Sequence, residues 1–249
     1  MAAGWLMNVH RFYCEKITEP VSELAGPEAR HLASVLRLQK GQQVELFDGR
    51  GAAGIAAVKT ITDKMIILDV KSLQVFPQRT TGRIIIAVSI AKGERFDWLV
   101  EKCTELGIDR LCPVLFERTV KSAAGSQILQ RWKRLAISAA KQSGRYLLPI
   151  IDSPASLTDI LNTLRIDYPS ADILLGQPEP QTLPVIQFPF SGKDLIVFVG
   201  PEGGLTDSEK SLLIKAGASP VHLTDTVLRV ETAALAFASI LAAMRDSSQ

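Results

Sequence analysis

The loop at residues 200–205 (GPEGGL) constrains the fold most, because it separates a strongly apolar run from a well-marked helix start. Residues 195–199 before it are all apolar, which is typical of a parallel strand covered on both faces. After it, Thr206 and Glu209 have capping-box spacing and predict a helix that runs to Gly217. Open α/β sheets hold ligands where a buried strand leads into a helix. The alternative is a tight glycine-rich turn without a ligand.

A second segment near the C-terminus strengthens the ligand hypothesis. Residues 221–223 predict a short strand, and residues 224–232 (TDTVLRVET) lead into an apolar helix up to Met244. Together with the first loop, this segment resembles the SPOUT class of S-adenosylmethionine-dependent RNA methyltransferases. Within that class it is most similar to the family that methylates N3 of a uridine in bacterial 16S ribosomal RNA.

The motifs of that family can be followed residue by residue. The family pattern is an apolar strand ending in GPEGG, followed by LGxRILRxETA before the last helix. The first motif is complete here, and the second keeps Leu223, Leu228, Arg229, Glu231, Thr232 and Ala233. The chain departs at residues 224–226 (TDT), where the family usually has a Gly and a basic residue.

The resemblance extends over most of the chain. Residues 92–107 (KGERFDWLVEKCTELG) resemble the family's first catalytic-domain helix, and residues 142–145 (QSGR) match a second element, although Lys141 stands where the family commonly has Glu. The resemblance implies an RNA-binding, PUA-like β-barrel domain at residues 1–76. It also implies a SPOUT-type methyltransferase domain at residues 83–249, of α/β class, with a parallel sheet and a C-terminal trefoil knot.

Residue patterns independently support this two-part organisation. Short β-type runs fill residues 10–75 around one helix, which has Pro27 in its first turn and Gly41 beyond its end. Strands and helices then alternate, which predicts a parallel sheet with helices on both faces. Residues 49–54 (GRGAAG) match the dinucleotide fingerprint GxGxxG, but β-branched residues follow instead of a helix. A hairpin is therefore predicted there, not a nucleotide site.

Basic residues gather in the middle of a chain whose net charge is only +2. Between residues 118 and 151 there are seven basic residues and no acidic one: Arg118, Lys121, Arg131, Lys133, Arg134, Lys141 and Arg145. Such a run is either a solvated helix face or a footprint for nucleic-acid phosphates. We take Arg11, Arg37, Arg118, Arg131, Lys133 and Arg145 as the candidates for RNA contact.

The resemblance implies S-adenosylmethionine as the cofactor, held by three strand-end loops with apolar walls and backbone hydrogen bonds. We expect it to contact Leu175, Gly176, Gly200, Pro201, Glu202, Gly203, Leu223, Thr224 and Leu228. On this placement, Gly203→Val would close the site.

Methylation at uracil N3 removes a proton and leaves negative charge on the carbonyl oxygens. Arg229 is the candidate to stabilise that charge, unless it only pairs with Glu231 for structure. Glu202 and Glu231 are the possible proton acceptors, unless they only hold the loops.

Composition excludes several other classes of protein. No apolar run reaches the roughly 20 residues that span a bilayer, and the start carries no signal-sequence pattern, so we expect a cytoplasmic protein without a membrane partner. Cys14, Cys103 and Cys112 lack metal-ligand spacing, which predicts reduced, mostly buried thiols and no metal.

The expected partners are 16S ribosomal RNA in the small ribosomal subunit and a second copy of the chain. A homodimer is expected because the last helix is apolar nearly all round, and one face of a sheet cannot cover every side of it. A non-catalytic ribosome-binding module of the same fold and a nucleotide-dependent oxidoreductase remain alternatives.

Overall fold

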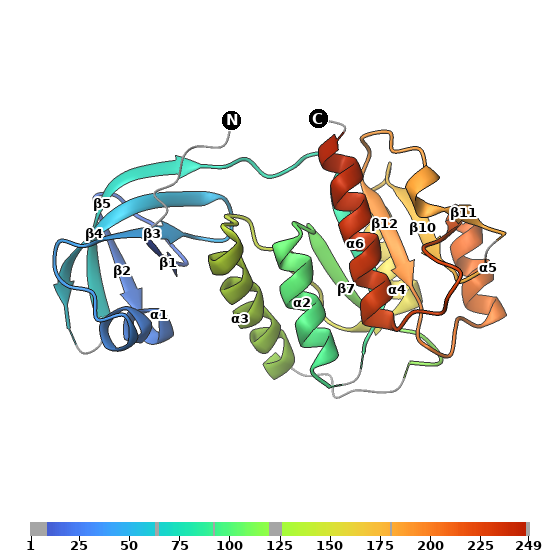
Figure 1. Cartoon of the computed structure of the whole chain (residues 1–249), viewed down its shortest axis with the longest axis horizontal. Helices are drawn as coiled ribbons and strands as arrows, with labels where there is room; N and C mark the ends of the chain where they lie inside the picture. Colours follow the sequence, from blue (N-terminus) through green and yellow to red (C-terminus); the bar gives the residue numbers. More distant parts are fainter. Residues whose placement is uncertain (1–8, 63–64, 92, 120–125, 180, 248–249) are drawn as a thin grey trace. The chain divides into compact units, whose positions relative to one another are not determined.

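The chain forms two compact units (Figure 1). The structure is a computed structural model that describes residues 9–62, 65–91, 93–119, 126–179 and 181–247. Unit 1 takes Met1–Gln78 with Ala140–Leu148, and unit 2 takes Arg79–Ala139 with Pro149–Gln249. Lys92 and Lys121, which belong to the motifs above, lie outside the described residues.

Unit 1 is a curled sheet with one short helical segment (Figure 1). Its strands pair in the order β1-β3-β4-β5-β2, with β1 parallel to β3 and the other pairs antiparallel. The core lies between the sheet and the helical segment and includes Phe12, Leu32 and Leu46. The elements are β1 (His10–Tyr13), β2 (Val21–Ala25), α1 (Gly26–Arg30), η1 (His31–Val35), β3 (Gln43–Phe47), β4 (Ala52–Ile61) and β5 (Met65–Val75).

The glycine-rich turn in unit 1 is the predicted hairpin between β3 and β4. One carboxylate oxygen of Asp48 accepts hydrogen bonds from the backbone N–H groups of Arg50 (2.7 Å) and Ala52 (2.9 Å). Gly51 has φ of 113°, and a Cβ there would lie 2.2 Å from the carbonyl oxygen of Phe76. These glycines therefore serve the turn sterically, and β4 follows them where a nucleotide site would need a helix.

Residues 140–148 belong to unit 1, although a boundary drawn along the sequence places them with the second domain. Arg11 holds them there: its guanidinium donates to the carbonyl oxygens of Ala140 (2.8 Å) and Arg145 (3.0 Å) and pairs with Glu45 at 2.6 Å. It also lies over the ring of Tyr146, 4.9 Å from the centroid. With 12% of its side chain exposed, Arg11 is an internal tie of unit 1, so little of it is left for the RNA contact expected from its charge.

Lys141, where the chain departs from the family motif, has a partner on α1. Its ammonium group donates to both carboxylate oxygens of Glu28, at 2.9 and 3.0 Å. A basic residue at this position is therefore matched by an acidic one 113 residues away along the chain.

Replacing Arg11 with Met is expected to lower the free energy of unfolding by about 3–5 kcal/mol, because Glu45 then stays buried without its counter-charge. Arg11→Met combined with Glu45→Leu should recover most of that loss. Urea unfolding measures both, with Lys71→Met as the control, because the Lys71–Asp69 pair is exposed. If Arg11→Met costs no more than Lys71→Met, Arg11 is not the tie described here.

Unit 2 has a parallel sheet, as predicted, in the order β11-β13-β10-β12-β6-β7-β8, with β9 also beside β7. Its strands are β6 (Ile84–Ser89), β7 (Arg110–Leu115), β8 (Ile150–Ile151), β9 (Ala155–Ser156), β10 (Asp172–Gly176), β11 (Leu183–Pro184), β12 (Leu195–Val199) and β13 (Ser219–His222). Its helices are α2 (Arg95–Glu105), α3 (Ser126–Ser143, whose end lies in unit 1), α4 (Leu157–Asp167), η2 (Val185–Gln187), α5 (Asp207–Lys215) and α6 (Val230–Ser247).

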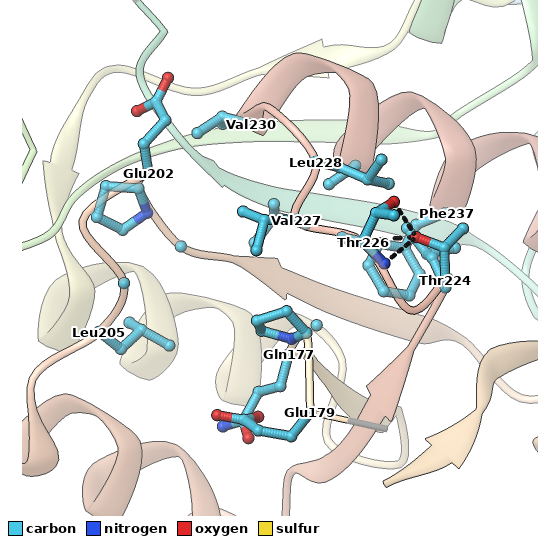
Figure 2. A pocket seen from close by; sticks show the side chains of 18 of the residues that line it. Gln177, Glu179, Glu202, Leu205, Thr224, Thr226, Val227, Leu228, Val230 and Phe237 are labelled. Carbon is cyan, nitrogen blue, oxygen red and sulfur yellow. Dashed lines mark hydrogen bonds between the residues drawn. The ribbon is translucent and has the colours of Figure 1, made fainter. Parts of the chain in front are cut away.

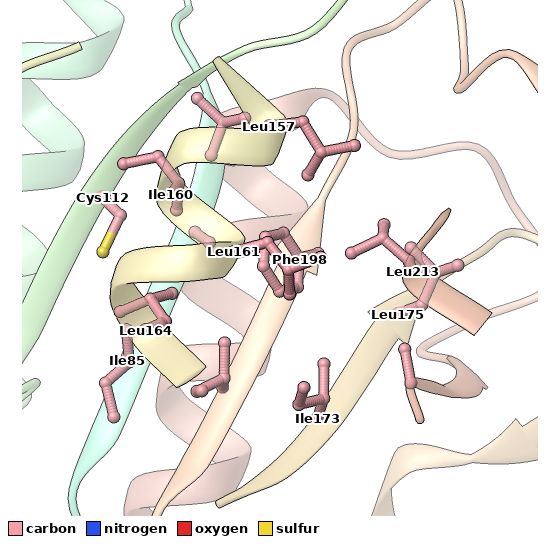
Figure 3. Packing of buried hydrophobic residues seen from close by; sticks show 14 of the residues in the cluster. Ile85, Cys112, Leu157, Ile160, Leu161, Leu164, Ile173, Leu175, Phe198 and Leu213 are labelled. Carbon is pink, nitrogen blue, oxygen red and sulfur yellow. The ribbon is translucent and has the colours of Figure 1, made fainter. Parts of the chain in front are cut away.

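Helices cover the two faces of this sheet separately. On one face, α4 and α5 enclose a core in which Ile85, Leu161 and Phe198 meet (Figure 3). On the other face, α6 packs on β6 and β12 and against α2. Side chains alternate along a strand, so fully apolar strands such as β12 fill both cores at once.

The predicted capping box forms at the start of α5. The Thr206 side chain accepts from the backbone N–H of Glu209, and the Glu209 carboxylate accepts from the backbone N–H of Thr206 at 2.8 Å. The second Glu209 oxygen accepts from the backbone N–H of Glu117 after β7, also at 2.8 Å. This buried carboxylate therefore ties the helix to the end of a neighbouring strand.

All three cysteines are free and buried, as predicted, and burial raises the pKa of Cys103 to about 12. Among the residues that the structure describes, no helix is long and apolar enough to cross a membrane. In the same residues, no group of three or more His, Cys, Asp or Glu side chains is placed to hold a metal ion.

Candidate functional site

A cavity of about 300 Å³ opens at the carboxyl ends of β10, β12 and β13 (Figure 2). Its walls come from the loops after these three strands and the first two turns of α6, with Arg118 after β7 and Lys210 on α5. The lining residues are Arg118, Gly176, Gln177, Pro178, Glu179, Val199, Gly200, Pro201, Glu202, Gly204, Leu205, Lys210, Leu223, Thr224, Thr226, Val227, Leu228, Val230, Ala233 and Phe237. This is the place that the motif between β12 and α5 predicts for a ligand.

Gly176, at the end of β10, lines the cavity and lies against an aromatic ring of α6. A Cβ there would lie 2.6 Å from the ring of Phe237, which is itself buried in α6. At the end of β12, a Cβ on Gly200 would lie 3.1 Å from the Leu205 side chain. The two glycines therefore leave room for the Phe237 and Leu205 side chains, which line the cavity beside them.

The loop after β13 supplies much of the apolar wall. Val227 and Leu228 lie on the cavity side of this loop (Figure 2), and 79% of Val227 is exposed. The loop is closed locally, because the Thr224 hydroxyl donates to the carbonyl oxygen of Thr226 at 3.2 Å and lies 3.1 Å from its hydroxyl. The two threonines that replace the family's usual residues thus form a turn that holds this wall.

Charged side chains surround the opening of the cavity. Lys210 of α5 pairs with Glu179 at 3.2 Å, and the second oxygen of Glu179 is buried without a hydrogen-bond partner among the described residues. Arg118 donates to the carbonyl oxygen of Gly203 at 2.7 Å, and Glu202 is exposed beside it. The mouth therefore offers both acceptors and donors to a charged ligand.

A second, open hollow of about 410 Å³ lies between the first turns of α2 and α6. It is lined by Glu94, Arg95, Trp98, Arg229, Glu231 and Thr232. At the start of α6 the two hollows share a wall: Leu228 and Val230 line the cavity, whereas Arg229 and Glu231 line the open hollow. Alternate residues of this segment thus line two neighbouring hollows.

Glu231 pairs with Arg95 at 3.6 Å, and not with Arg229. Its second oxygen is buried without a hydrogen-bond partner in the described part of the chain. Arg229 is exposed and forms no ion pair with any described residue. The structural pairing of Arg229 with Glu231, considered from the sequence, is therefore not formed.

Most of the residues expected to contact a cofactor line the cavity: Gly176, Gly200, Pro201, Glu202, Leu223, Thr224 and Leu228. Leu175 and Gly203 do not. The Leu175 side chain faces the core under α4 and α5, because alternation along β10 turns it away from the site. A Cβ on Gly203 would make only ordinary contacts with Arg118, at 3.5 Å, so no clash at this position supports the expected closure by valine.

Several lining residues were not anticipated. Glu179 and Lys210 lie just beyond a predicted strand and inside a predicted helix, and Phe237 lies two turns along α6 from Val230. The helical spacing of Val230, Ala233 and Phe237 was the available signal for the α6 stripe. Nothing near Trp98 in the sequence marked it as part of a hollow.

The remaining RNA candidates differ in how their side chains are held. Arg37, Arg118, Arg131 and Lys133 are exposed. Arg131 forms an ion pair with Asp97 and still has 54% of its side chain exposed. Arg145 is half-buried, and its Nε donates to the carbonyl oxygen of Leu147 at 3.3 Å.

Comparison with known families decides the assignment. Residues 78–242 match the family model described as an RNA methyltransferase domain, and residues 24–71 match the RNA methyltransferase PUA domain. The chain belongs to the RNA methyltransferase family. The resemblance read from the loop motifs is thereby confirmed.

Individual relatives are similar to this RNA methyltransferase over most of its length. The chain is 31% identical over 233 residues to the ribosomal RNA small subunit methyltransferase E of a Synechocystis species, covering 88% of this chain and 72% of that protein. A crystal structure of a probable rRNA methyltransferase from Porphyromonas gingivalis is similar with a TM-score of 0.86 at 28% identity, covering 97% and 100% of the two chains.

A third relative was solved with a cofactor. The ribosomal RNA small subunit methyltransferase E of Neisseria gonorrhoeae, bound to S-adenosylmethionine, has a TM-score of 0.83 at 28% identity, covering 96% and 98% of the two chains. Solved structures of this family thus include one that binds S-adenosylmethionine.

Proposed function

We propose that this chain is an S-adenosylmethionine-dependent methyltransferase that methylates N3 of a uridine in 16S ribosomal RNA of the small ribosomal subunit. The observation that carries the proposal is the cavity at three strand-end loops, walled by both family motifs. A non-catalytic RNA-binding module would not need this cavity, and no feature of the residues that the structure describes favours that alternative. Residues 49–54, on which an oxidoreductase would depend, form a hairpin.

The residues at the cavity fit S-adenosylmethionine. A volume of about 300 Å³ lies at the lower end of the range of small-molecule sites. Leu223, Leu228 and Phe237 offer an apolar wall to an adenine ring, and Gly176 and Gly200 line the cavity beside them. Acceptors on Glu179 and Glu202 suit the cationic groups of this cofactor.

The residues around the start of α6 suit methylation of an acidic N–H. When bound, S-adenosylmethionine supplies a methyl group on a positively charged sulfur, which keeps the electron pair of the broken carbon–sulfur bond. Arg229 would donate hydrogen bonds to a uracil carbonyl oxygen and stabilise the negative charge left when N3 loses its proton. Glu231 or Glu202 would accept that proton.

RNA binding is proposed for both units. Residues 1–76 would form the RNA-binding domain and residues 83–249 the methyltransferase domain. Arg37, Arg118, Arg131 and Lys133, whose side chains are exposed, would contact phosphates, and half-buried Arg145 would add a contact at the edge of its loop. Arg11 is left out because its guanidinium is used inside unit 1.

Replacing Arg131 and Lys133 together with Ala is expected to weaken RNA binding and to flatten its salt dependence by about one unit of slope per lost phosphate contact. The rate of the chemical step at saturating RNA should not change. Titrations at several salt concentrations measure this, with Lys193→Ala plus Lys215→Ala as the control, since these exposed lysines lie outside the basic segment. An unchanged slope in the Arg131 and Lys133 variant would rule out phosphate contact.

A trefoil knot and a homodimer belong to the same proposal. The chain leaves β13 near one side of the sheet, yet α6 returns over β12 and β6, which is the path that a threaded C-terminal segment takes.

Helix α6 buries one stripe of side chains and leaves Leu235, Ala236 and Ile240 only partly covered, as a subunit interface would require. Light scattering measures the subunit count. A cytoplasmic location follows from the proposed ribosomal substrate.

Two measurements test the proposed reaction. Transfer of a radiolabelled methyl group to small-subunit RNA would show the activity, and mass mapping of 16S RNA from cells lacking the protein would identify the uridine. A chain that binds the RNA and S-adenosylmethionine but transfers no methyl group would contradict the proposal.

A further inference from the structure

The open hollow beside the cavity contains an unusual exposed aromatic side chain. Trp98 lies at the end of the first turn of α2 with 41% of its surface exposed, whereas Trp132 is 1% exposed. Large aromatic side chains normally bury most of their apolar surface. The exposed part of the Trp98 ring is available to a flat apolar group that stacks on it.

The groups around Trp98 define what could cover it. Arg95, Arg229 and Glu231 line the same hollow, and they bring two positive charges and one negative charge to it. A nucleobase combines the two properties that this set recognises, because its faces stack on aromatic rings and its edge carries carbonyl oxygens and N–H groups. Uracil offers two carbonyl acceptors to arginine and one imide donor to a carboxylate.

The position of the hollow supports the same occupant. Val230 lines the cofactor cavity, and its neighbours Arg229 and Glu231 line the hollow with Trp98. A base stacked on Trp98 would therefore be separated from the cavity by this backbone segment. Uracil N3 lies on the Watson–Crick edge, so its methylation requires an unpaired base, and enzymes that modify bases take them out of the stack. An aromatic platform at this place would hold such a base.

We propose that Trp98 is the stacking platform for the target uracil of the RNA substrate, with the base's polar edge directed toward Arg229 and Glu231. This inference rests on the proposed function and adds a base-binding residue that neither loop motif contains. Arg95 is a positioning residue in this arrangement, since it pairs with Glu231 at 3.6 Å.

Trp98→Leu tests the proposal against Trp98→Phe, which keeps an aromatic face. The Leu variant should raise the KM for RNA by about tenfold, as expected for loss of one base–aromatic stack, with the affinity for S-adenosylmethionine unchanged. The Phe variant should stay within about threefold of wild type. Ile214→Ala on α5, another exposed apolar side chain in unit 2, is the matched control and should leave the KM unchanged.

Tryptophan fluorescence gives a readout that does not depend on methyl transfer. A single-stranded oligonucleotide with the target uridine should quench the wild-type emission, and Trp98→Phe should remove that quenching. If the wild type shows quenching but no methyl transfer, the proposed function fails while the base platform stands.

Two results would overturn the platform itself. One is a Trp98→Leu variant that methylates RNA with an unchanged KM. The other combines two measurements: Trp98→Leu changes the subunit count in light scattering, and the oligonucleotide still quenches the emission of Trp98→Phe as strongly as that of the wild type. Trp98 would then belong to a subunit interface.

Discussion

Replacing Gly176 with Val is expected to weaken S-adenosylmethionine binding by about tenfold to a hundredfold or more, since overpacking a filled site costs roughly 1–3 kcal/mol. A Cβ at this position would lie 2.6 Å from the Phe237 ring. That ring is 2% exposed and lines the cavity, so the open space into which it can move is the cavity itself. Calorimetric titration measures the affinity.

Two further variants separate closure of the cavity from general damage. Gly203→Val is the matched control, because its Cβ would meet Arg118 at an ordinary 3.5 Å and the residue does not line the cavity. Its affinity should stay within about twofold of wild type. Gly176→Ala combined with Phe237→Leu should bind more tightly than Gly176→Ala alone. Thermal unfolding without cofactor shows whether each variant is folded, and equal losses in the Gly176 and Gly203 variants would place the cofactor elsewhere.

Arg229→Ala is expected to lower the single-turnover rate of methylation by about a hundredfold to a thousandfold, which is the usual effect of removing a donor to a developing oxyanion. The affinity for S-adenosylmethionine should stay nearly intact, because Arg229 lies outside the cavity and its interaction strengthens only as charge develops on the base.

Arg229→Lys is the informative companion, since it keeps the charge and loses the planar pair of donors. Arg229→Lys should recover part of the methylation rate if a positive charge is enough to stabilise the base. It should recover little of that rate if the planar pair of donors is required. Both variants are measured with RNA and cofactor at saturation, so that weakened binding does not lower the observed rate. If Arg229→Ala turns over like wild type under these conditions, the carboxylates must act without it.

Elements defined by local interactions could be predicted closely from the sequence. The bounds of β12 agree with the apolar run at residues 195–199, and α5 begins at its capping box. The helix after Pro27 was expected to extend nearly to Gly41, yet η1 ends at Val35 and Arg37 takes a φ of 52°. Leaving the helix there brings Leu38 into the core, which outweighs local helix preference. The two-residue strands β8, β9 and β11 carry no periodic pattern at all.

Both the local sequence pattern and the long-range tertiary contacts determine the candidate site. The order of strands and helices, and the three loops that bound the cavity, follow from interactions between residues a few positions apart, so they can be read along the chain. The tertiary structure alone assigns Arg11 to the interior of unit 1, turns Leu175 away from the cavity and leaves Trp98 exposed beside Arg229. Each of these outcomes depends on contacts between residues far apart in sequence, such as Arg11 with Ala140, for which periodicity and spacing carry no signal.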